Sequence, residues 1–149
     1  MLSDYEQAKE KAQAAFDHAA EELTSGDYTY TEEDVEFEVI TSKVLPASTG
    51  IPTDLVRLSD SYKVSEMIPV TPMEPLHIKA CSHYSNSIYV FYDEDERMID
   101  KLVSGEEAAV TEFDGALVVP LRAAYLRIAY MTSTLTGYVK RMTRSGFVG

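Results

Sequence analysis

Residues 77–92 read HIKACSHYSNSIYVFY, and this stretch sets the expected fold of the chain. Two β-forming runs, 77–80 and 87–92, stand on either side of Ser85 and Asn86. Serine and asparagine favour tight turns because their side chains bond nearby backbone groups, and asparagine tolerates a left-handed backbone. The stretch therefore predicts a β-hairpin with an antiparallel sheet around it.

More short β-forming runs lie on both sides of this stretch, between residues 27 and 101. Residues 35–39, VEFEV, alternate apolar and acidic side chains, which is the pattern of a strand with one buried face. Further runs at 55–58 and 62–70 are separated by prolines and polar clusters at 46–52, 59–60 and 69–75. The middle of the chain thus predicts a small antiparallel sheet of about four to six strands. Residues 98–103 fit either a strand or a helical turn.

The first residues of the chain predict a helix. Ser3 followed by Glu6 forms a capping box, in which the two side chains bond free backbone N–H groups of the first turn. Gly26 is a stop signal. Between them, apolar residues recur at spacings typical of a helix: Tyr5, Ala8, Ala12, Ala15, Phe16, Ala19 and Leu23. The expected helix covers about residues 4–24, and its alanine stripe buries little apolar area.

The C-terminal part of the chain has the longest periodic pattern. Beyond Asp114, a suitable N-cap, apolar residues recur at helical spacing: Leu117, Val118, Leu121, Ala124, Tyr125, Ile128, Ala129, Thr132 and Leu135. Pro120 fits a helix only in its first turns, because an interior proline costs about 3 kcal/mol.

These segments predict one α+β domain over residues 1–149. It consists of an N-terminal helix in 1–26, a β-rich middle with a small antiparallel β-sheet in 27–112, a long C-terminal helix in 113–142, and a basic tail in 143–149.

Charge is distributed unevenly along the chain. The chain has 13 basic and 25 acidic residues, and its formal net charge is −12. All 25 acids precede residue 115, so the first 114 residues carry −17 and the last 35 carry +5. Opposite charges on two parts of a subunit favour a heterologous contact between copies, which closes into a ring or extends into a filament.

The acidic character of the whole chain argues against DNA surfaces and anionic membranes as general partners. The N-terminus has no basic region followed by an apolar core, as a secretion signal would, and no apolar run is long enough to cross a bilayer. We therefore expect a soluble protein that is made in the cytoplasm and has no membrane partner.

Motifs for catalysis and cofactor binding are missing from the sequence. No glycine-rich loop resembles a phosphate cradle, and no Gly-x-Ser-x-Gly turn supports a nucleophilic serine. We therefore expect neither an enzyme nor a cofactor. His77, Cys81 and His83 fall within seven residues, and on an extended strand they would share one face. A metal site and an ordinary half-buried strand both fit this spacing.

Basic and aromatic residues near the C-terminus are the candidate contacts with a neighbouring subunit: Arg122, Arg127, Tyr138, Lys140, Arg141, Arg144 and Phe147. The basic residues have two interpretations. They oppose the negative end of the predicted helix dipole, or they form a basic arm that enters an acidic pocket on another subunit.

Four segments in a fixed order carry a family resemblance: IPTDLVRL at 51–58, IPVTPME at 68–74, YSNSIYVFY at 84–92, and EFD at 112–114 leading into 117–130. With the N-terminal helix before them, the chain resembles the head-to-tail connector (adaptor) proteins of tailed bacteriophages, including those called tail tubular protein A. The family usually has a longer chain and a pair of N-terminal helices, where this sequence has one.

The resemblance implies a structural virion protein in the neck of a phage, assembled in the host cytoplasm. It implies a dodecameric ring of copies of this chain beneath the portal protein, with a tail or nozzle protein as a further neighbour. The C-terminal arm would reach the portal, and genomic DNA would pass through an acidic channel without sequence-specific binding. A terminator, tail-completion or other neck protein fits the same pattern.

A different class of protein also fits the acidic composition. A small inhibitor that mimics the charge of DNA would block a DNA-binding protein. Such a mimic is expected to be a monomer or dimer with its acids on one contiguous face.

Overall fold

One helix and twelve strands make up the part of the chain that the computed structural model describes, residues 3–54, 61–105, 110–134 and 136–148. The helix is α1, Asp4–Ser25. The strands are β1 (Tyr28–Asp34), β2 (Val39–Thr41), β3 (Lys43–Val44), β4 (Thr53–Asp54), β5 (Tyr62–Ser65), β6 (Ile68–Pro69), β7 (Pro75–Ser82), β8 (Ser87–Tyr92), β9 (Met98–Val103), β10 (Thr111–Val118), β11 (Tyr125–Met131) and β12 (Tyr138–Phe147). The predicted run at 55–58 lies outside the described residues.

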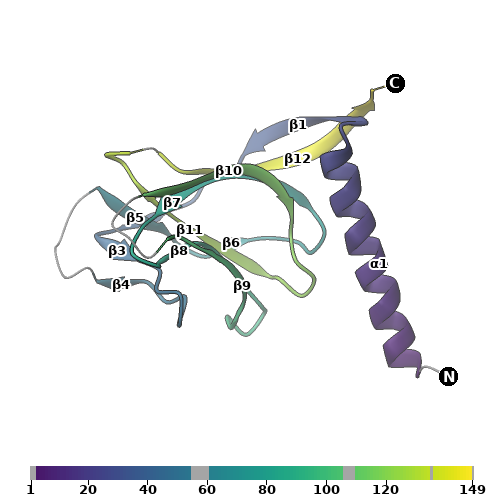
Figure 1. Ribbon diagram of the computed structural model, residues 1–149, viewed down its shortest axis with the longest axis horizontal. Helices are drawn as coiled ribbons and strands as arrows, with labels where there is room; N and C mark the ends of the chain where they lie inside the picture. Colours follow the sequence, from purple (N-terminus) through teal and green to yellow (C-terminus); the bar gives the residue numbers. More distant parts are fainter. Residues whose placement is uncertain (1–2, 55–60, 106–109, 135, 149) are drawn as a thin grey trace.

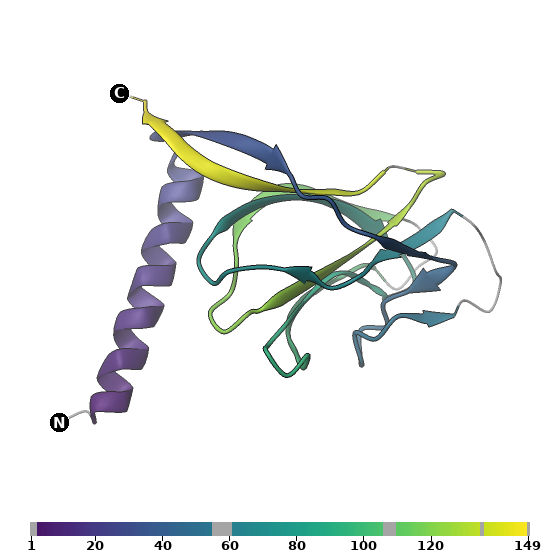
Figure 2. The same cartoon turned by 180° about the vertical axis from the view of Figure 1, so that it is seen from behind.

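The strands form two antiparallel sheets that face each other, and β3 pairs with β4 beside them (Figures 1 and 2). The first sheet has the order β1-β12-β7-β10, and the second has the order β2-β5-β11-β8-β9, with β6 also on β11. Eight main strands, β1, β5 and β7–β12, can be numbered 1 to 8 along the chain. The first sheet then reads 1-8-3-6, and the second contains 2-7-4-5. This is the strand order of a jelly roll.

The predicted N-terminal helix is confirmed. The Ser3 hydroxyl accepts a hydrogen bond from the Glu6 N–H at 3.1 Å, and Gly26 ends the helix with a left-handed φ of 79°. None of the α1 residues is buried, and residues 4–15 are all exposed. The half of α1 that follows, from Phe16 to Leu23, lies against the sandwich near β10 and β1.

The stretch 77–92 contains the two predicted strands and the predicted turn, but it is not a hairpin. Tyr84 and Ser85 have positive φ values of 56° and 59°, and the Asn86 N–H bonds the His83 carbonyl at 3.1 Å. β7 pairs with β10 and β12, whereas β8 pairs with β9 and β11. The turn therefore carries the chain from one sheet to the other, because both strands bury apolar side chains in the same core.

The predicted C-terminal helix over 113–142 and the basic tail over 143–149 are wrong, and so is the α+β fold class. The described part of this region consists of β10, β11 and β12, and residues 143–147 pair with β1 as far as Phe147 opposite Tyr28. Buried side chains on both faces of β11 produce spacings of three and four that mimic a helix. Pro120 lies in the turn between β10 and β11, where its missing N–H costs nothing. The chain is mostly β, and the single-domain expectation stays a prediction.

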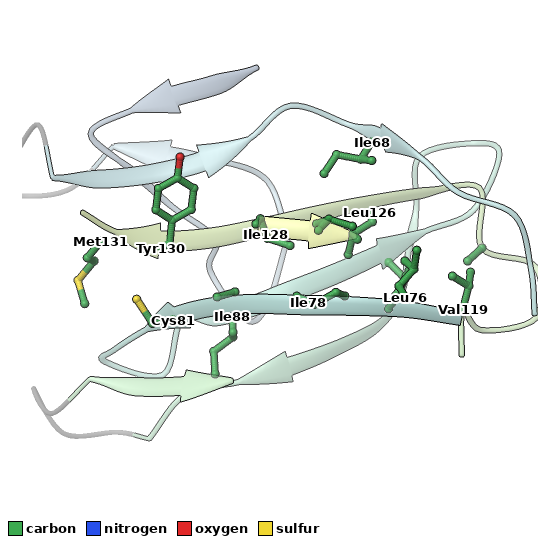
Figure 3. Close-up of a cluster of buried hydrophobic side chains, with 14 residues drawn as sticks. Ile68, Leu76, Ile78, Cys81, Ile88, Val119, Leu126, Ile128, Tyr130 and Met131 are labelled. Carbon is green, nitrogen blue, oxygen red and sulfur yellow. The ribbon is translucent and has the colours of Figure 1, made fainter. Parts of the chain in front are cut away.

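The main core lies between the two sheets (Figure 3). Leu76 and Ile78 of β7 pack there with Leu126 and Ile128 of β11, and all four are fully buried. Packing of this kind supplies most of the free energy of folding, at about 25 cal/mol per Å² of apolar surface removed from water.

A second, smaller core covers the outer face of the second sheet. Val90 and Tyr92 of β8 point outward there and pack under Leu45. The Tyr92 hydroxyl donates to the Gly50 carbonyl, and the Ser87 N–H donates to the Leu45 carbonyl at 2.6 Å. Residues 43–54 therefore shield this face, and burial raises the pKa of Tyr92 to about 12.

Candidate functional site

The first half of α1, residues 4–15, is the most exposed regular element of the described chain. We call it the α1 overhang. Its apolar residues are Tyr5, Ala8, Ala12 and Ala15, and Tyr5 is 76% exposed. Their spacing of three, four and three places them on one face of the helix. A helix normally buries such a face, so the overhang presents a contact surface.

Charged residues of the overhang lie on both sides of the apolar stripe and opposite to it. At about 100° per residue, Lys9 and Lys11 flank the apolar stripe on its two sides. Glu6 and Glu10 lie on the opposite face, whereas Asp4 lies beside the stripe on the side of Lys11. The apolar stripe therefore has a lysine on each side and Asp4 on one of them, and the whole helix carries more acids than bases.

Spaces remain between α1 and the sandwich. One pocket of about 450 Å³ lies between Phe16 of α1 and the side chains of Phe91, Leu117 and Leu121. A second pocket lies between Ala19 and the outer face of the first sheet, near Tyr30. The Arg144 guanidinium bridges α1 and β12 by bonding Glu22 at 3.1 Å. The helix is thus held at its C-terminal half, and its packing there is incomplete.

A groove of about 880 Å³ lies where the chain crosses from the first sheet to the second. The segment 35–38 makes this crossing, and its alternating sequence decides which side chains point inward. Val35 and Phe37 pack against the main core, whereas Glu36 and Glu38 are exposed. The Val35 N–H bonds the Val139 carbonyl at 2.9 Å, which fixes the start of the crossing on β12. We call this feature the acidic groove.

Carboxylates surround the acidic groove. Its described lining includes Asp34, Glu36, Glu38 and Glu66 and contains no lysine or arginine. Lys140 lies outside this lining, and its Nζ is 3.9 Å from the Asp34 carboxylate on the outer face of the first sheet. The apolar lining residues are Val35, Phe37, Val39, Met67, Ile68, Pro69, Tyr130, Tyr138 and Val139. The groove thus has an apolar floor and an acidic rim.

Five of the predicted contact residues lie on β12, and the structure brings two of them together. The ammonium of Lys140 lies 4.6 Å from the ring centroid of Tyr138. Arg141 bonds Glu74 at 3.2 Å and the Pro69 carbonyl at 3.1 Å. Arg144 lies over the Tyr28 ring at 4.4 Å, and Phe147 contacts the same ring. Most of these side chains contact groups of their own chain, and their role at a neighbouring subunit stays a prediction.

The other two predicted contact residues lie elsewhere. Arg127 of β11 is half-buried beside the second core, and its Nη1 donates to the Ser65 carbonyl at 3.2 Å. Arg122 is exposed in the turn before β11 with a φ of 72°. The seven residues therefore do not form one surface.

His77 lies on the outer face of the first sheet, between two carboxylates. Its Nδ1 lies 2.6 Å from Glu32 of β1 and its Nε2 lies 2.5 Å from Asp114 of β10. Partial burial lowers the pKa of His77, but the hydrogen bonds and negative charges of Asp114 and Glu32 outweigh this effect. The pKa is therefore raised above 6.5, and the imidazolium bridges the two strands.

The residues proposed as metal ligands are separated. Cys81 is fully buried, and burial raises the pKa of its thiol. His83 lies beyond the end of β7, with its Nε2 2.9 Å from the Tyr62 hydroxyl, and burial lowers its pKa. Within the described residues, no group of three or more histidines, cysteines and acids is placed to hold a metal ion. The metal hypothesis therefore receives no support.

The sequence predicted only part of these two contact surfaces, the acidic groove and the α1 overhang. The VEFEV pattern at 35–39 signalled one buried and one acidic face, but not a groove at a crossing between sheets. The helical period alone places Lys9 and Lys11 on the two sides of the apolar stripe. The uneven charge distribution instead predicted a contact surface at the basic C-terminus.

No helix in the described residues has the length and apolar character that crossing a bilayer requires.

The sequence matches no protein-family model and no curated protein. Among solved structures, the chain is similar to the enzymatically active domain of tailspike protein 4 of bacteriophage CBA120, with a TM-score of 0.27 and 14% identity. The match covers 87% of this chain and 20% of the tailspike chain, so this chain spans about a fifth of that structure's length. A likeness this distant carries no argument about what this chain does.

Proposed function

We propose that this chain is a structural subunit that assembles into a multimer through α1. The exposure of the α1 overhang carries the proposal: residues 4–15 contain no buried residue, yet their apolar side chains share one face. Most of the stability of a helix in a protein comes from the packing of its apolar face, and this half of α1 has no such packing within the described subunit. A neighbouring subunit provides that packing in the assembled state.

The finer role that we propose is a ring-forming adaptor in the neck of a tailed-phage virion. The order of segments within residues 51–92 supports it, and jelly rolls are also used in viral capsid proteins. This second support is an analogy between folds. In this role the portal protein and a tail or nozzle protein are the neighbours, twelve copies form the ring, and genomic DNA passes through without base-specific contacts.

The expectation that the chain is not an enzyme is part of the same proposal. The polar clusters described above are held by strands and pair with each other, as His77 does with Glu32 and Asp114. We propose that they stabilise the sheet rather than act on a substrate.

The DNA-mimic alternative has no specific observation in its favour. A mimic needs its carboxylates on one contiguous face. The described acids are spread over α1, the acidic groove, the turn at 93–96 and several strands of both sheets, and Glu22 and Glu74 pair with arginines.

The decisive experiment measures the mass of the full chain in solution by native mass spectrometry and analytical ultracentrifugation. We expect a multimer, and removal of residues 1–15 is expected to yield a folded monomer. Proteomic analysis of purified particles of the encoding phage tests the virion role. A full chain that stays monomeric at every concentration and ionic strength, and that is missing from the particles, contradicts the proposal.

A further inference from the structure

We propose that the α1 overhang of one copy docks in the acidic groove of the next copy. This inference rests on the proposed multimer and names the two surfaces that join its subunits. The occupant of the groove is thus a second copy of this chain.

Complementary charge is the first argument. The overhang has an apolar stripe with Lys9 and Lys11 on its two sides, and the groove has an apolar floor with carboxylates around it. Glu36, Glu38 and Glu66 have no ion pair among the described residues, and neither have Lys9 and Lys11. Docking therefore pairs lysines and carboxylates that have no ion pair within the described part of the subunit, and Glu6 and Glu10 lie on the face of the overhang that is turned away.

The side chains also suit a close approach. Ala8, Ala12 and Ala15 are small, so a helix that presents them lies close to the surface beneath it. Phe37 and Met67 in the groove are only half-buried within the subunit and provide apolar contact area. Tyr5 is the large side chain of the overhang, and tyrosines buried at an interface commonly carry much of its binding energy.

The positions of the two surfaces require a contact between copies. α1 joins β1 through Gly26 and Asp27 at the Tyr28 end, whereas the acidic groove begins at Asp34, at the opposite end of β1. A strand of seven residues is about 20 Å long from first to last residue. Figures 1 and 2 both show α1 joined to the start of β1 and running away from the end of β1 at which the groove begins. The overhang of a subunit therefore cannot reach its own groove.

Such a contact is heterologous, because it joins two different patches. Heterologous contacts repeat from subunit to subunit and close into a ring when the rotation between neighbours allows it. The negative groove of one copy and the basic-sided helix of the next thus give the multimer its direction. This contact is an alternative to the C-terminal basic arm that the charge distribution suggested, whose residues Lys140, Arg141 and Arg144 lie on a strand.

Charge-reversal variants of the full chain test the docking. Glu36→Lys with Glu38→Lys places lysines opposite Lys9 and Lys11 and is expected to weaken the association by about tenfold or more. Lys9→Glu with Lys11→Glu is expected to weaken it similarly. All four changes together restore opposite charges and are expected to regain most of the lost affinity. Tyr5→Ala is also expected to weaken it.

The matched control is Glu6→Lys with Glu10→Lys, which changes the net charge as much as the groove variant but on the opposite face of α1. We expect it to leave the dissociation constant within a few-fold of wild type. Far-UV circular dichroism verifies that each variant keeps its fold, and sedimentation at about 150 mM salt gives the dissociation constant.

The outcomes separate the two proposals. If the wild-type chain associates but the combined variant stays weak, or if the control weakens association as much as the groove variant, the docking is wrong while the multimer stands. If the wild-type chain does not associate at all, both proposals fail.

Discussion

α1 and β11 both carry apolar side chains, but the two elements have very different surroundings. β11 is buried along most of its length, with Leu126 and Ile128 in the main core and Ala129 in the second core. α1 has no buried residue, and its apolar stripe consists largely of alanine. The strand therefore contributes to the stability of the sandwich, whereas the helix adds little to it. The exposed apolar stripe is the observation from which we proposed a partner for α1.

The largest expected effect on stability comes from a substitution in the main core, which is compared with a substitution in α1. Leu126→Ala removes a fully buried side chain from the main core and is expected to lower the free energy of unfolding by about 2–5 kcal/mol. Ala12→Gly in the exposed overhang costs about 1 kcal/mol of local helix stability. It should leave the urea midpoint of the sandwich unchanged. Urea unfolding followed by tyrosine fluorescence, with hydrogen exchange for α1, measures both. Equal shifts of the unfolding midpoint would show that helix and sandwich unfold as one unit.

A glycine in the acidic groove gives the next largest effect. A Cβ atom on Gly137 would lie 2.6 Å from Cδ1 of the buried Tyr130 ring and 3.0 Å from the Lys79 carbonyl oxygen. Gly137→Ala is therefore expected to cost about 1–3 kcal/mol through overpacking. Gly105→Ala is the matched control, since its Cβ would meet only Thr111 at 3.8 Å. If the urea midpoints of both variants equal that of wild type, the side chains and backbone around Gly137 move to accommodate the added methyl group at little cost in free energy.

The contrast between helix and strand also explains what the sequence revealed. The Ser3 cap, the Gly26 stop and the spacing between them describe a helix whose signals are all local, and they predicted α1 correctly. The turn near Ser85 was also predicted correctly. Its pairing was not, because turn residues do not tell whether the following strand joins the same sheet or crosses to the opposite one.

The C-terminal error has a physical cause in burial on two faces. The even residues of β11 enter the main core, while Tyr125 and Ala129 pack in the second core because residues 43–54 cover that face. Apolar residues on both faces erase the alternation that marks a half-buried strand. The buried residues still alternate by two at Leu126, Ile128 and Tyr130, and the turns contain Pro120 and Gly137. Both features are typical of strands.

The candidate site was only partly predictable for a related reason. The outward acids at 36 and 38 follow from local alternation, but the groove they surround forms between segments distant in sequence, such as Phe37 and Met67. No local pattern reports such a meeting.

Two tyrosines offer a matched test with a smaller expected effect. The buried Tyr92 hydroxyl donates to the Gly50 carbonyl, and Tyr92→Phe leaves that acceptor unpaired. We expect a loss of about 0.5–1.5 kcal/mol in the free energy of unfolding. Tyr5→Phe on the overhang, where the ring is 76% exposed, should leave urea unfolding unchanged. Alkaline titration followed by tyrosine absorbance should also show one ring ionising near pH 12, and this signal should disappear in Tyr92→Phe.

The smallest effect concerns two histidines, one on the sheet and one on the helix, and it depends on pH. The pKa of His77 is raised above 6.5 in the folded chain, because Asp114 and Glu32 together outweigh the effect of burial. A raised folded pKa means that protonated His77 stabilises the fold fully at pH values below about 6.5. This contribution is lost as the pH rises through the folded pKa.

His77→Gln should therefore lower the urea midpoint at about pH 5.5 and have a smaller effect at about pH 8.5. His18→Gln is the counterpart on α1, where His18 contacts Glu22 at 2.9 Å and its side chain is 71% exposed. The exposed pair contributes little to stability in water, so this variant should leave the urea midpoint close to that of wild type. A His77→Gln profile parallel to that of wild type would mean that the imidazolium does not link β1 to β10. The outer face of the first sheet would then resemble α1 in adding little to the stability of the sandwich.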